Sequence, residues 1–270
     1  MRILLFGGAG FIGEYLARVL HARSDCDIIV VDRDSQTTAQ DFDADIVVVL
    51  TQPNGPVKNV LLPAITLAKN IKKIVYLSTL LLYPDAPHTQ DETVAPDPKT
   101  EYEIGKHNEE LLLSDFTAER DFVLCIPRLA NIYGDIQNRG IVHYMLLSAI
   151  KGDEFIVFGD KDKKVRDYIF IEDVVRFLEF LVFYPQSNKK EIFNICTGVG
   201  YSIAELISTL EAISGKQVNV NVGRSVLEKK SIIGENKKIL NLSGYEPEHD
   251  LTRGLQKTYR NYTAFYLSKS

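Results

Sequence analysis

The sequence has few of the residues that build disulfides and metal sites. Its 270 residues include only three cysteines and five histidines, and both kinds are scattered along the chain. Cys26, Cys125 and Cys196 show neither a redox pairing nor the spacing of metal ligands, and no His/Cys cluster suggests a metal site. We therefore expect free buried thiols, a reducing cytoplasmic location and no bound metal.

The chain also lacks an excess of positive charge and long apolar runs. Its net charge is −5 and its Lys and Arg residues are dispersed, so it has no basic surface of the kind that binds nucleic acid. No apolar run approaches the ~20 residues needed to cross a bilayer. The first residues form an apolar strand and not a cationic leader, so we expect no secretory signal. Neither nucleic acid nor a membrane is an expected partner.

The most informative stretch is a glycine-rich turn near the start. The apolar run Met1–Phe6 leads directly into glycines at 7, 8, 10 and 13, and an amphipathic helix follows. A strand, a glycine turn and a helix offer backbone N–H groups to a pyrophosphate. Gly7 permits the turn, Gly10 lets the backbone approach the phosphates, and Gly13 lets the helix pack against its strand. The cofactor contacts expected here are Gly7, Gly10, Phe11, Ile12 and Gly13.

An acidic residue ends the second predicted strand, Asp27–Asp32. Asp32 lies nineteen residues beyond Gly13, the spacing at which a carboxylate meets the adenosine ribose of a dinucleotide. Such a carboxylate accepts hydrogen bonds from the ribose hydroxyls and repels a 2′-phosphate, which favours NAD. Arg33 follows it and is able to pair with a 2′-phosphate, so NADP stays open. We expect Asp32 and Arg33 to contact the cofactor.

The region after Asp32 is shorter than a dinucleotide-binding sheet usually requires. Only the thirteen residues 33–45 separate the second strand from the next predicted strand, Ile46–Leu50. A parallel crossover alone needs a dozen or more residues, so a helix, a strand and a second helix do not fit. Asp41-Phe42 is either a vestige of the missing strand, with Phe42 near the adenine, or part of a surface loop. The predicted sheet is therefore shortened around its third strand.

The rest of the chain alternates between strands and helices, apart from a proline-rich loop over residues 85–98. Ser202 is a plausible N-cap, with Glu205 at the capping-box position. This alternation predicts an α/β fold, a Rossmann-type doubly wound parallel sheet with both faces covered. The further strands are expected at 74–78, 122–126, 155–158, 168–171 and 192–195, and the helices at 14–22, 57–70, 100–114, 141–150, 172–184, 203–214 and 251–267.

A tyrosine and a lysine share one face of the helix expected at 100–114. Tyr102 and Lys106 are four residues apart, so their side chains lie one turn apart on the same face. A phenol has a pKa of ~10, too high for a base at neutral pH, and a neighbouring ammonium lowers it by favouring the phenolate. Tyr102 is therefore a candidate general acid or base at an alcohol or carbonyl. The spacing alone also fits a surface pair.

Several features in a fixed order point to one enzyme family. A glycine turn, an acid after the second strand, a hydroxyl after a later strand and a Tyr/Lys pair follow one another along the chain. This combination resembles the extended short-chain dehydrogenase/reductase family, specifically its nucleotide-sugar epimerases, dehydratases and reductases. The segment 78–83, STLLLY, is similar to the family motif in which the second hydroxyl is catalytic. The resemblance assigns that role to Thr79, together with Tyr102 and Lys106.

Two later segments carry the same resemblance. Residues 128–134, RLANIYG, are similar to a motif whose asparagine contacts the substrate diphosphate, which implies that role for Asn131. Residues 166–173, RDYIFIED, are similar to a motif whose arginine binds the diphosphate, which implies that role for Arg166; the alternative is a structural pair with Asp167 or Asp173. Arg224 falls near a second diphosphate-binding arginine, although the local match is poor. The resemblance also implies cofactor contacts from Leu50, Asn59 and Ser78 and a substrate contact from Leu80.

Departures from the family pattern narrow the expected reaction. Leu80 and Leu81 occupy positions where dehydratases carry an acidic pair and decarboxylases a glutamate. A leucine transfers no proton, so hydride transfer at C4 of a nucleotide-sugar is the favoured chemistry. We slightly favour a 4-ketoreductase, because a short adenosine region should ease cofactor exchange. A 4-epimerase that keeps its cofactor is the alternative, and a non-catalytic dinucleotide-binding regulator is the second one.

The resemblance also implies how the chain is divided and assembled. We expect a dinucleotide-binding domain of residues 1–134 and 166–196. A smaller, discontinuous substrate domain comprises residues 135–165 and 197–270. A nucleotide-diphosphate sugar would lie between the two domains. Relatives of this kind dimerise through the helices expected at 57–70 and 100–114, so we expect a homodimer.

Overall fold

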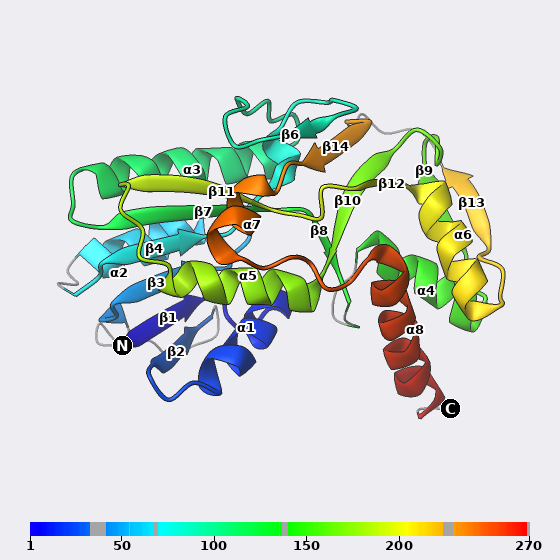
Figure 1. Ribbon diagram of the computed structural model, residues 1–270, viewed down its shortest axis with the longest axis horizontal. Coiled ribbons are helices and arrows are strands. Elements are labelled where there is room, and N and C mark those ends of the chain that lie inside the picture. Colours follow the sequence, from blue (N-terminus) through cyan, green and yellow to red (C-terminus); the bar gives the residue numbers. More distant parts are fainter. Residues whose placement is uncertain are drawn as a thin grey trace.

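The computed structural model describes residues 1–32, 42–53, 55–66, 70–134, 136, 140–223 and 229–268. A seven-stranded parallel sheet forms one half of the molecule, at the left of Figure 1. Its strand order is β11-β7-β4-β3-β1-β2, with β5 pairing beside β7. The bounds are β1 Arg2–Phe6, β2 Asp27–Val31, β3 Ile46–Val49, β4 Lys73–Tyr76, β5 Ser78–Thr79, β7 Val123–Leu129 and β11 Lys190–Ile195.

Helices cover both faces of this sheet. On one face lie α1 (Phe11–His21) and α5 (Ile171–Phe183), whose apolar residues join Ile3 and Leu5 in one core cluster. On the other face lie the π-helix η2 (Val57–Leu61), α2 (Leu62–Thr66) and α3 (Glu101–Ala118). This arrangement confirms the predicted doubly wound α/β fold. None of the helices in the described ranges is long and apolar enough to cross a membrane.

The strand β2 lies at the edge of the sheet and corrects one expectation. The sequence predicts a strand buried on both faces, but Val30 is 40% exposed and only Val31 is buried. Within the described residues β2 pairs with β1 alone. Residues 33–41, including Arg33 and Asp41, lie outside the described part of the chain. Phe42 buries its ring against Phe6, with the ring centroids 6.5 Å apart.

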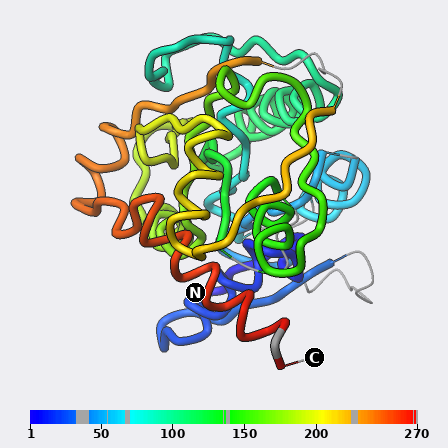
Figure 2. The backbone as a smooth tube through the Cα atoms, turned by 90° about the vertical axis from the view of Figure 1, so that its right-hand side faces the viewer, coloured from blue at the N-terminus to red at the C-terminus, as the bar shows by residue number. Residues whose placement is uncertain are grey.

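The second half is built around a five-stranded sheet in the order β12-β10-β14-β6, with β8 pairing beside β10. Figure 2 views the molecule from this side. The short strand β6 (Thr89–Gln90) lies within residues 85–98, which the sequence predicts as loop, and it pairs with β14 (Ser231–Gly234). The predicted capping box of Ser202 and Glu205 is confirmed at the start of α6. The other elements are η3 Leu80–Leu82, β8 Asn131–Tyr133, α4 Ile141–Lys151, β9 Phe155–Phe158, β10 Val165–Phe170, β12 Gly200–Ser202, α6 Ile203–Ser214, β13 Val220–Gly223, α7 Lys237–Ser243 and α8 Leu251–Leu267.

Two segments bear on how the halves divide. Residues 131–133 and 165–170 form β8 and β10, which pair with each other in the second sheet, whereas β11 belongs to the first sheet. The expected domain limits place both segments, apart from Val165, in the dinucleotide-binding unit. The predicted division into two domains therefore stays a proposal, with limits at 1–134 and 166–196 for one domain and 135–165 and 197–270 for the other. The strands β8 and β10 are the segments whose sheet pairing differs from these limits.

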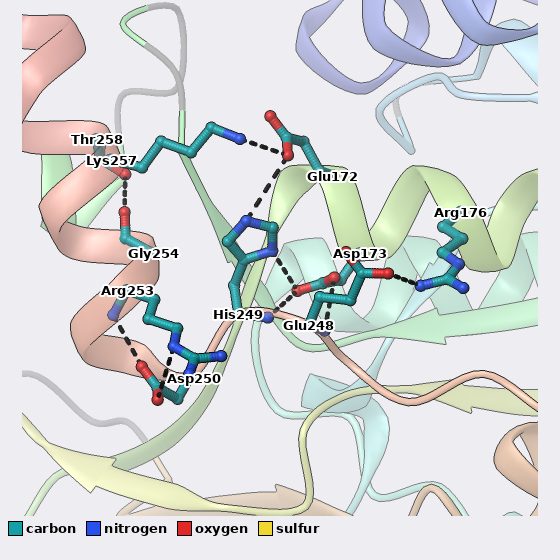
Figure 3. Close-up of polar contacts among 10 residues, drawn as sticks. All are labelled: Glu172, Asp173, Arg176, Glu248, His249, Asp250, Arg253, Gly254, Lys257 and Thr258. Atoms are coloured by element: carbon teal, nitrogen blue, oxygen red, sulfur yellow. Dashed lines mark hydrogen bonds and ion pairs between the residues drawn. The ribbon is translucent and has the colours of Figure 1, made fainter.

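A polar cluster joins the start of α5 to the C-terminal helix α8 (Figure 3). Asp173 accepts hydrogen bonds from the backbone N–H groups of Glu248 and His249, and the His249 ring Nδ1 lies 3.1 Å from its Oδ2. Lys257 of α8 reaches Glu172 of α5, with 2.6 Å between Nζ and Oε2. We call these residues, with Arg176, the α5–α8 cluster. It fixes α8 against the first half of the molecule.

Candidate active site

The glycine-rich turn has the close backbone contacts that its spacing predicts. Gly7 has φ of +84°, a conformation that favours glycine, and donates its N–H to Val31 O at 2.7 Å. A Cβ on Gly13 would lie 2.2 Å from Gly8 O, so the helix could not approach the turn with any other residue there. A Cβ on Gly10 would meet only Gly7 O, at 3.6 Å. The space outside Gly10 is therefore open.

Asp32 lies against this turn, as the sequence predicts for an acid after the second strand. Its Oδ2 accepts a hydrogen bond from the Ala9 N–H at 3.1 Å. The turn, the start of α1 and a carboxylate therefore meet at the carboxyl edge of β1 and β2. Arg33, the residue that leaves NADP open, lies outside the described residues.

Two hydroxyls follow β4 at the same edge of the sheet. Ser78 and Thr79 form β5, and both are buried. Thr79 Oγ1 accepts a hydrogen bond from the Leu81 N–H at 3.2 Å, and Thr79 is the N-cap of the short helix η3. Because that bond uses a lone pair, the Thr79 hydroxyl proton is left to be donated to a ligand.

Tyr102 and Lys106 lie one turn apart on α3, beside these hydroxyls. Tyr102 is 38% exposed, whereas Lys106 is 4% exposed. The Lys106 ammonium donates to Leu77 O at 2.8 Å and to Thr51 O at 3.0 Å. These bonds join the ends of β3 and β4 to α3, and they use two of the three ammonium donors. One donor of Lys106 is left for a ligand.

The electrostatic environment keeps Tyr102 protonated in the protein by itself. Burial and the Glu109 carboxylate raise the Tyr102 pKa. Burial lowers the pKa of Lys106 to about 8, against the opposing effects of Glu109 and Glu110. The Lys106 ammonium lies 4.8 Å from the centre of the Tyr76 ring, whose hydroxyl donates to Glu109 Oε2 at 2.8 Å. A lowered Tyr102 pKa is not seen here and stays a prediction for the ligand-bound enzyme.

A glycine between the two proposed catalytic residues lets a loop approach α3. A Cβ on Gly105 would lie 2.9 Å from the Pro53 Cβ and 3.1 Å from the Pro53 carbonyl oxygen. Glycine within a helix costs roughly 1 kcal/mol relative to alanine. Its presence at position 105 is explained by this contact, which brings the loop after β3 against the helix face that carries Tyr102 and Lys106.

The proposed diphosphate-binding residues lie together on β8 and β10. Asn131 Nδ2 donates to Asp167 O at 3.3 Å. The Arg166 guanidinium donates to the carbonyls of Val165 at 2.9 Å, Lys230 at 3.0 Å and Lys229 at 2.6 Å. Arg224, the second arginine implied by the resemblance, lies outside the described residues.

Asp167 and Asp173, the two possible structural partners of Arg166, make hydrogen bonds elsewhere. Asp167 accepts hydrogen bonds from the N–H groups of Thr197, at 2.9 Å, and Gly198, at 2.8 Å. Its burial raises its pKa to about 6 although these bonds act in the opposite direction. Asp173 belongs to the α5–α8 cluster. The diphosphate-binding role of Arg166 stays a prediction.

Three other predicted site residues have different surroundings. Leu80 is 2% exposed and packs in the core, where a Cβ on Gly234 would lie 2.9 Å from it. Its contact with substrate stays a prediction. Leu50 follows β3 and is partly buried, with its N–H donating to Phe6 O at 2.8 Å. Asn59 lies exposed on η2 with its N–H on Gly55 O at 2.9 Å.

The edge formed by these segments fits a dinucleotide. The hydroxyl oxygens of Thr51 and Ser78 are buried and have no hydrogen-bond partner within the described structure. Both residues belong to the segments that Lys106 joins. A bound dinucleotide would offer hydrogen-bond partners to these two hydroxyls and to the third donor of the Lys106 ammonium. Gly10 leaves space at the start of α1, where phosphates bind backbone N–H groups. The described residues hold no group of three or more acidic, His or Cys side chains placed for a metal ion.

A ring of buried charges around α3 was not anticipated from the sequence. Glu103, Lys106, Glu109 and Glu110 are all buried on this helix. Glu110 binds Arg128 with contacts of 2.7 and 3.0 Å, and the two side chains are 4% and 2% exposed. The signal was present, because residues 103, 106 and 110 recur at the spacing of a buried helix stripe. We call these residues with Arg128 and Lys229 the α3 cluster.

A cavity lies away from this edge and contains none of the proposed catalytic residues. It opens between β10, β12 and the segment before α8, next to the α5–α8 cluster of Figure 3. His249 and Asp250 contribute to its wall. Together, the parallel sheet and the glycine turn are typical of a dinucleotide-dependent α/β enzyme, and the Thr/Tyr/Lys set at the carboxyl edge of the first sheet is its candidate site.

Comparison with known proteins identifies the family. The model of the NAD dependent epimerase/dehydratase family matches residues 52–196, more than half of the chain. The chain belongs to this family, which confirms the resemblance seen in the sequence. It is therefore an enzyme, and NAD is the cofactor of its family.

Two relatives match more than nine-tenths of the chain. GDP-6-deoxy-D-talose 4-dehydrogenase of Aggregatibacter actinomycetemcomitans is 26% identical over 292 residues, covering 97% of this chain and 98% of the relative. UDP-glucose 4-epimerase of Corynebacterium glutamicum is 24% identical and covers 92% of each chain. The crystal structure of UDP-glucuronic acid 4-epimerase from Bacillus cereus with UDP-glucuronic acid and NAD matches with a TM-score of 0.89 at 24% identity. It covers 98% of this chain and 100% of that one. This likeness confirms the fold.

Proposed function

We propose that the protein is a nicotinamide-dependent oxidoreductase that transfers hydride at C4 of a nucleotide-activated sugar. The observation that carries this proposal is the hydrogen bond from the Lys106 ammonium to Leu77 O, which joins the helix of Tyr102 to the strand end that carries Thr79. The glycine turn and Asp32 lie at the same edge of the sheet. NAD is the proposed cofactor, with NADP as the alternative because Arg33 follows Asp32. When bound, the nicotinamide accepts the hydride from the sugar or returns it.

The chain's own residues move the proton and orient the substrate. Tyr102 exchanges the one transferred proton with the oxygen on C4, and Thr79 orients that oxygen by donating a hydrogen bond to it. Lys106 holds the ends of β3 and β4 against α3, and its remaining donor is available for the nicotinamide ribose. Its charge stabilises the Tyr102 phenolate when the proton leaves. Asn131 and Arg166 are the proposed contacts of the diphosphate, for which a planar guanidinium is suited.

One observation supports a 4-ketoreductase over a 4-epimerase. A relative matching nearly the whole chain is a 4-dehydrogenase, an enzyme of the same single hydride transfer. A 4-epimerase is the second candidate, supported by a relative of that activity. Leu80 and Leu81 carry no ionisable group, which disfavours 4,6-dehydration and decarboxylation.

The proposal extends to assembly and location. Val60 of η2 and Ile104 and Leu111 of α3 are 48%, 45% and 48% exposed. These apolar side chains on neighbouring helices support the proposed homodimer, which light scattering of the wild type and of an Ile104→Glu/Leu111→Glu variant would test. The three cysteines form no disulfide, which supports a reducing compartment such as the cytoplasm.

A substrate panel tests the activity. Purified enzyme is incubated with UDP-, dTDP- and GDP-sugars and oxidised cofactor, and with 4-keto-sugar nucleotides and reduced cofactor, while the nicotinamide absorbance is followed. A reductase changes the absorbance, whereas an epimerase yields the C4 epimer by NMR with no net change. Native mass spectrometry of retained ligand separates them further, because co-purified NAD favours the epimerase. No turnover of any member would leave only the non-catalytic regulator and contradict the proposal.

A further inference from the structure

A buried lysine from the second half of the molecule reaches the proposed catalytic residues. Lys229 precedes β14, and its side chain is 5% exposed. Its ammonium binds Glu103 Oε2 at 2.9 Å and also donates to Leu81 O. Glu103 is the neighbour of Tyr102 on α3, and the Leu81 N–H is the donor bound to Thr79 Oγ1. One ammonium therefore holds both segments that carry the proposed proton chemistry.

The backbone of the same lysine is held by the proposed diphosphate-binding arginine. Arg166 donates to Lys229 O at 2.6 Å and to Lys230 O at 3.0 Å. Val165 N–H also donates to Lys230 O, at 2.7 Å, so this stretch is fixed to β10. A continuous path of contacts runs from Arg166 through Lys229 to the turn of Thr79 and the helix of Tyr102. Figure 1 shows β14 beside the end of α3 that lies next to the carboxyl ends of the strands.

The hydrogen bonds around Glu103 indicate that the Glu103–Lys229 ion pair fixes the geometry of the segments it joins. Its Oε2 also accepts the Lys99 N–H at 2.7 Å, just before α3 begins. A buried ion pair adds little net stability, because desolvation offsets much of its Coulomb energy, but it specifies geometry when its hydrogen bonds are satisfied. Here the bonds converge on the first turn of α3 and on η3, the segments that must hold Tyr102 and Thr79 at a common substrate oxygen.

We propose that Lys229 is a positioning residue, which sets Tyr102 and Thr79 in register with the nucleotide end of the substrate bound at Arg166. This inference rests on the proposed function. It predicts that loss of the Lys229 ammonium slows the chemical step while the nucleotide still binds, because misplacement by about 1 Å costs roughly 100-fold in rate.

The test compares Lys229→Met, Lys229→Arg and Glu103→Gln with Lys237→Met as the control. Lys237 is a lysine whose side chain is 78% exposed. Substrate is the member of the UDP-, dTDP- and GDP-sugar panel that the wild type turns over fastest. We expect Lys229→Met to lower kcat about 10- to 100-fold with KM changed less than about threefold. Calorimetric binding of the matching nucleoside diphosphate should be unchanged, and Lys229→Arg should recover most of the rate.

A second mutation sharpens the assignment. The double variant Lys229→Met/Glu103→Gln should be about as slow as Lys229→Met alone, because the two residues act as a unit. A folded Lys229→Met with wild-type kcat, or one whose loss lies in nucleotide binding, would overturn the proposal. If Lys229→Met does not fold, Lys229→Arg and Glu103→Gln decide it, and a wild-type kcat in both overturns it.

The positioning role of Lys229 can be tested even if the proposed activity is wrong. A wild type that turns over no nucleotide-sugar counts against the proposed function alone. Amide hydrogen exchange then decides the positioning role: faster exchange in Lys229→Met over residues 79–83 and 100–106, with the rest of the chain unchanged, supports it. Unchanged exchange in both segments overturns it.

Discussion

The molecule carries two polar clusters of similar size, and they differ in burial. The α3 cluster pairs Glu110 with Arg128 and Glu103 with Lys229, and these side chains are 2–7% exposed. In the α5–α8 cluster, Asp173 and His249 are also mostly buried, at 4% and 16% exposed, but the outer pair of Lys257 and Glu172 is 44% and 43% exposed. Both clusters join segments far apart in sequence to one helix, α3 in the first and α5 in the second.

This difference shows what each cluster is for. Exposed ion pairs contribute little to the free energy of unfolding, so the loss of one partner costs little stability. Buried pairs are costly to break, because the remaining charge has no water around it. The buried pairs lie around the helix of Tyr102 and Lys106, the residues that are proposed to carry the proton transfer. The His249–Asp173 pair resembles an acid–base pair in composition, but it serves to attach α8.

The largest expected effect comes from removing the hydroxyl oxygen of Tyr102, the proposed proton donor on the helix that the α3 cluster surrounds. Tyr102→Phe should lower kcat by about 10²–10⁴-fold or more, because the general acid is lost, while cofactor binding is retained. Turnover is measured on the active member of the substrate panel, and NADH binding by fluorescence. Tyr144→Phe, at a tyrosine that is 50% exposed on α4, serves as the control. Near-wild-type turnover in Tyr102→Phe would remove the assignment.

Breaking a buried pair should cost far more stability than breaking an exposed one. Glu110→Ala leaves the Arg128 guanidinium buried without its carboxylate, and we expect a loss of about 3–5 kcal/mol in the free energy of unfolding. Urea denaturation measures it, with Glu119→Ala, at an exposed glutamate beyond the end of α3, as the control. A loss below about 1 kcal/mol would mean that the α3 cluster is no different from a surface network.

The pH dependence reports the burial of the α3 cluster directly. The folded-state pKa of Lys106 is lowered to about 8, below its ordinary value of 10.5, so its ammonium is lost as pH rises through about 8. We expect kcat/KM to fall roughly tenfold per pH unit above that value, since the charged form is needed. Lys106→Arg should be slower yet show no such fall up to pH 10. A wild-type fall that begins only near pH 10 would contradict a buried Lys106.

The smallest changes in stability and rate are expected at the exposed Lys257–Glu172 pair of the α5–α8 cluster. Lys257→Met removes the contact with Glu172 and should change the free energy of unfolding by about 0–1 kcal/mol, because water screens the pair. Its kcat and KM should equal those of the wild type. Thermal unfolding and the steady-state assay provide both values. A rate loss would show that the α5–α8 cluster has a part in the chemistry.

The sequence predicts the local features well and the long-range ones poorly. The glycine turn, the capped helix at Ser202 and the i,i+4 spacing of Tyr102 and Lys106 each depend on residues a few positions apart, and local rules describe such patterns. The parallel sheet follows from the alternation of apolar runs with amphipathic helices. The exposure of Val30 does not follow from this pattern, because it depends on whether a further strand lies beside β2.

The contacts between the two halves are the part that could not be predicted. Glu103 meets Lys229 over 126 residues of sequence, and each looks like an ordinary surface charge on its own. The strand β6 is two residues long and exists because β14 lies beside it. Nothing in the sequence near Leu80 indicates that its side chain packs beside Gly234. Such features become visible only when the fold brings the segments together.

The packing of Gly105 against Pro53 has a consequence for how this enzyme can change over evolution. A side chain at position 105 would strengthen the helix but would collide with the Cβ and the carbonyl oxygen of Pro53, so it is accessible only after the loop backbone at residue 53 has moved away. A change in the loop must therefore precede a substitution at position 105. A lineage that keeps the loop after β3 close to the catalytic helix also keeps a weak point in that helix, between the two residues on which its reaction is proposed to depend.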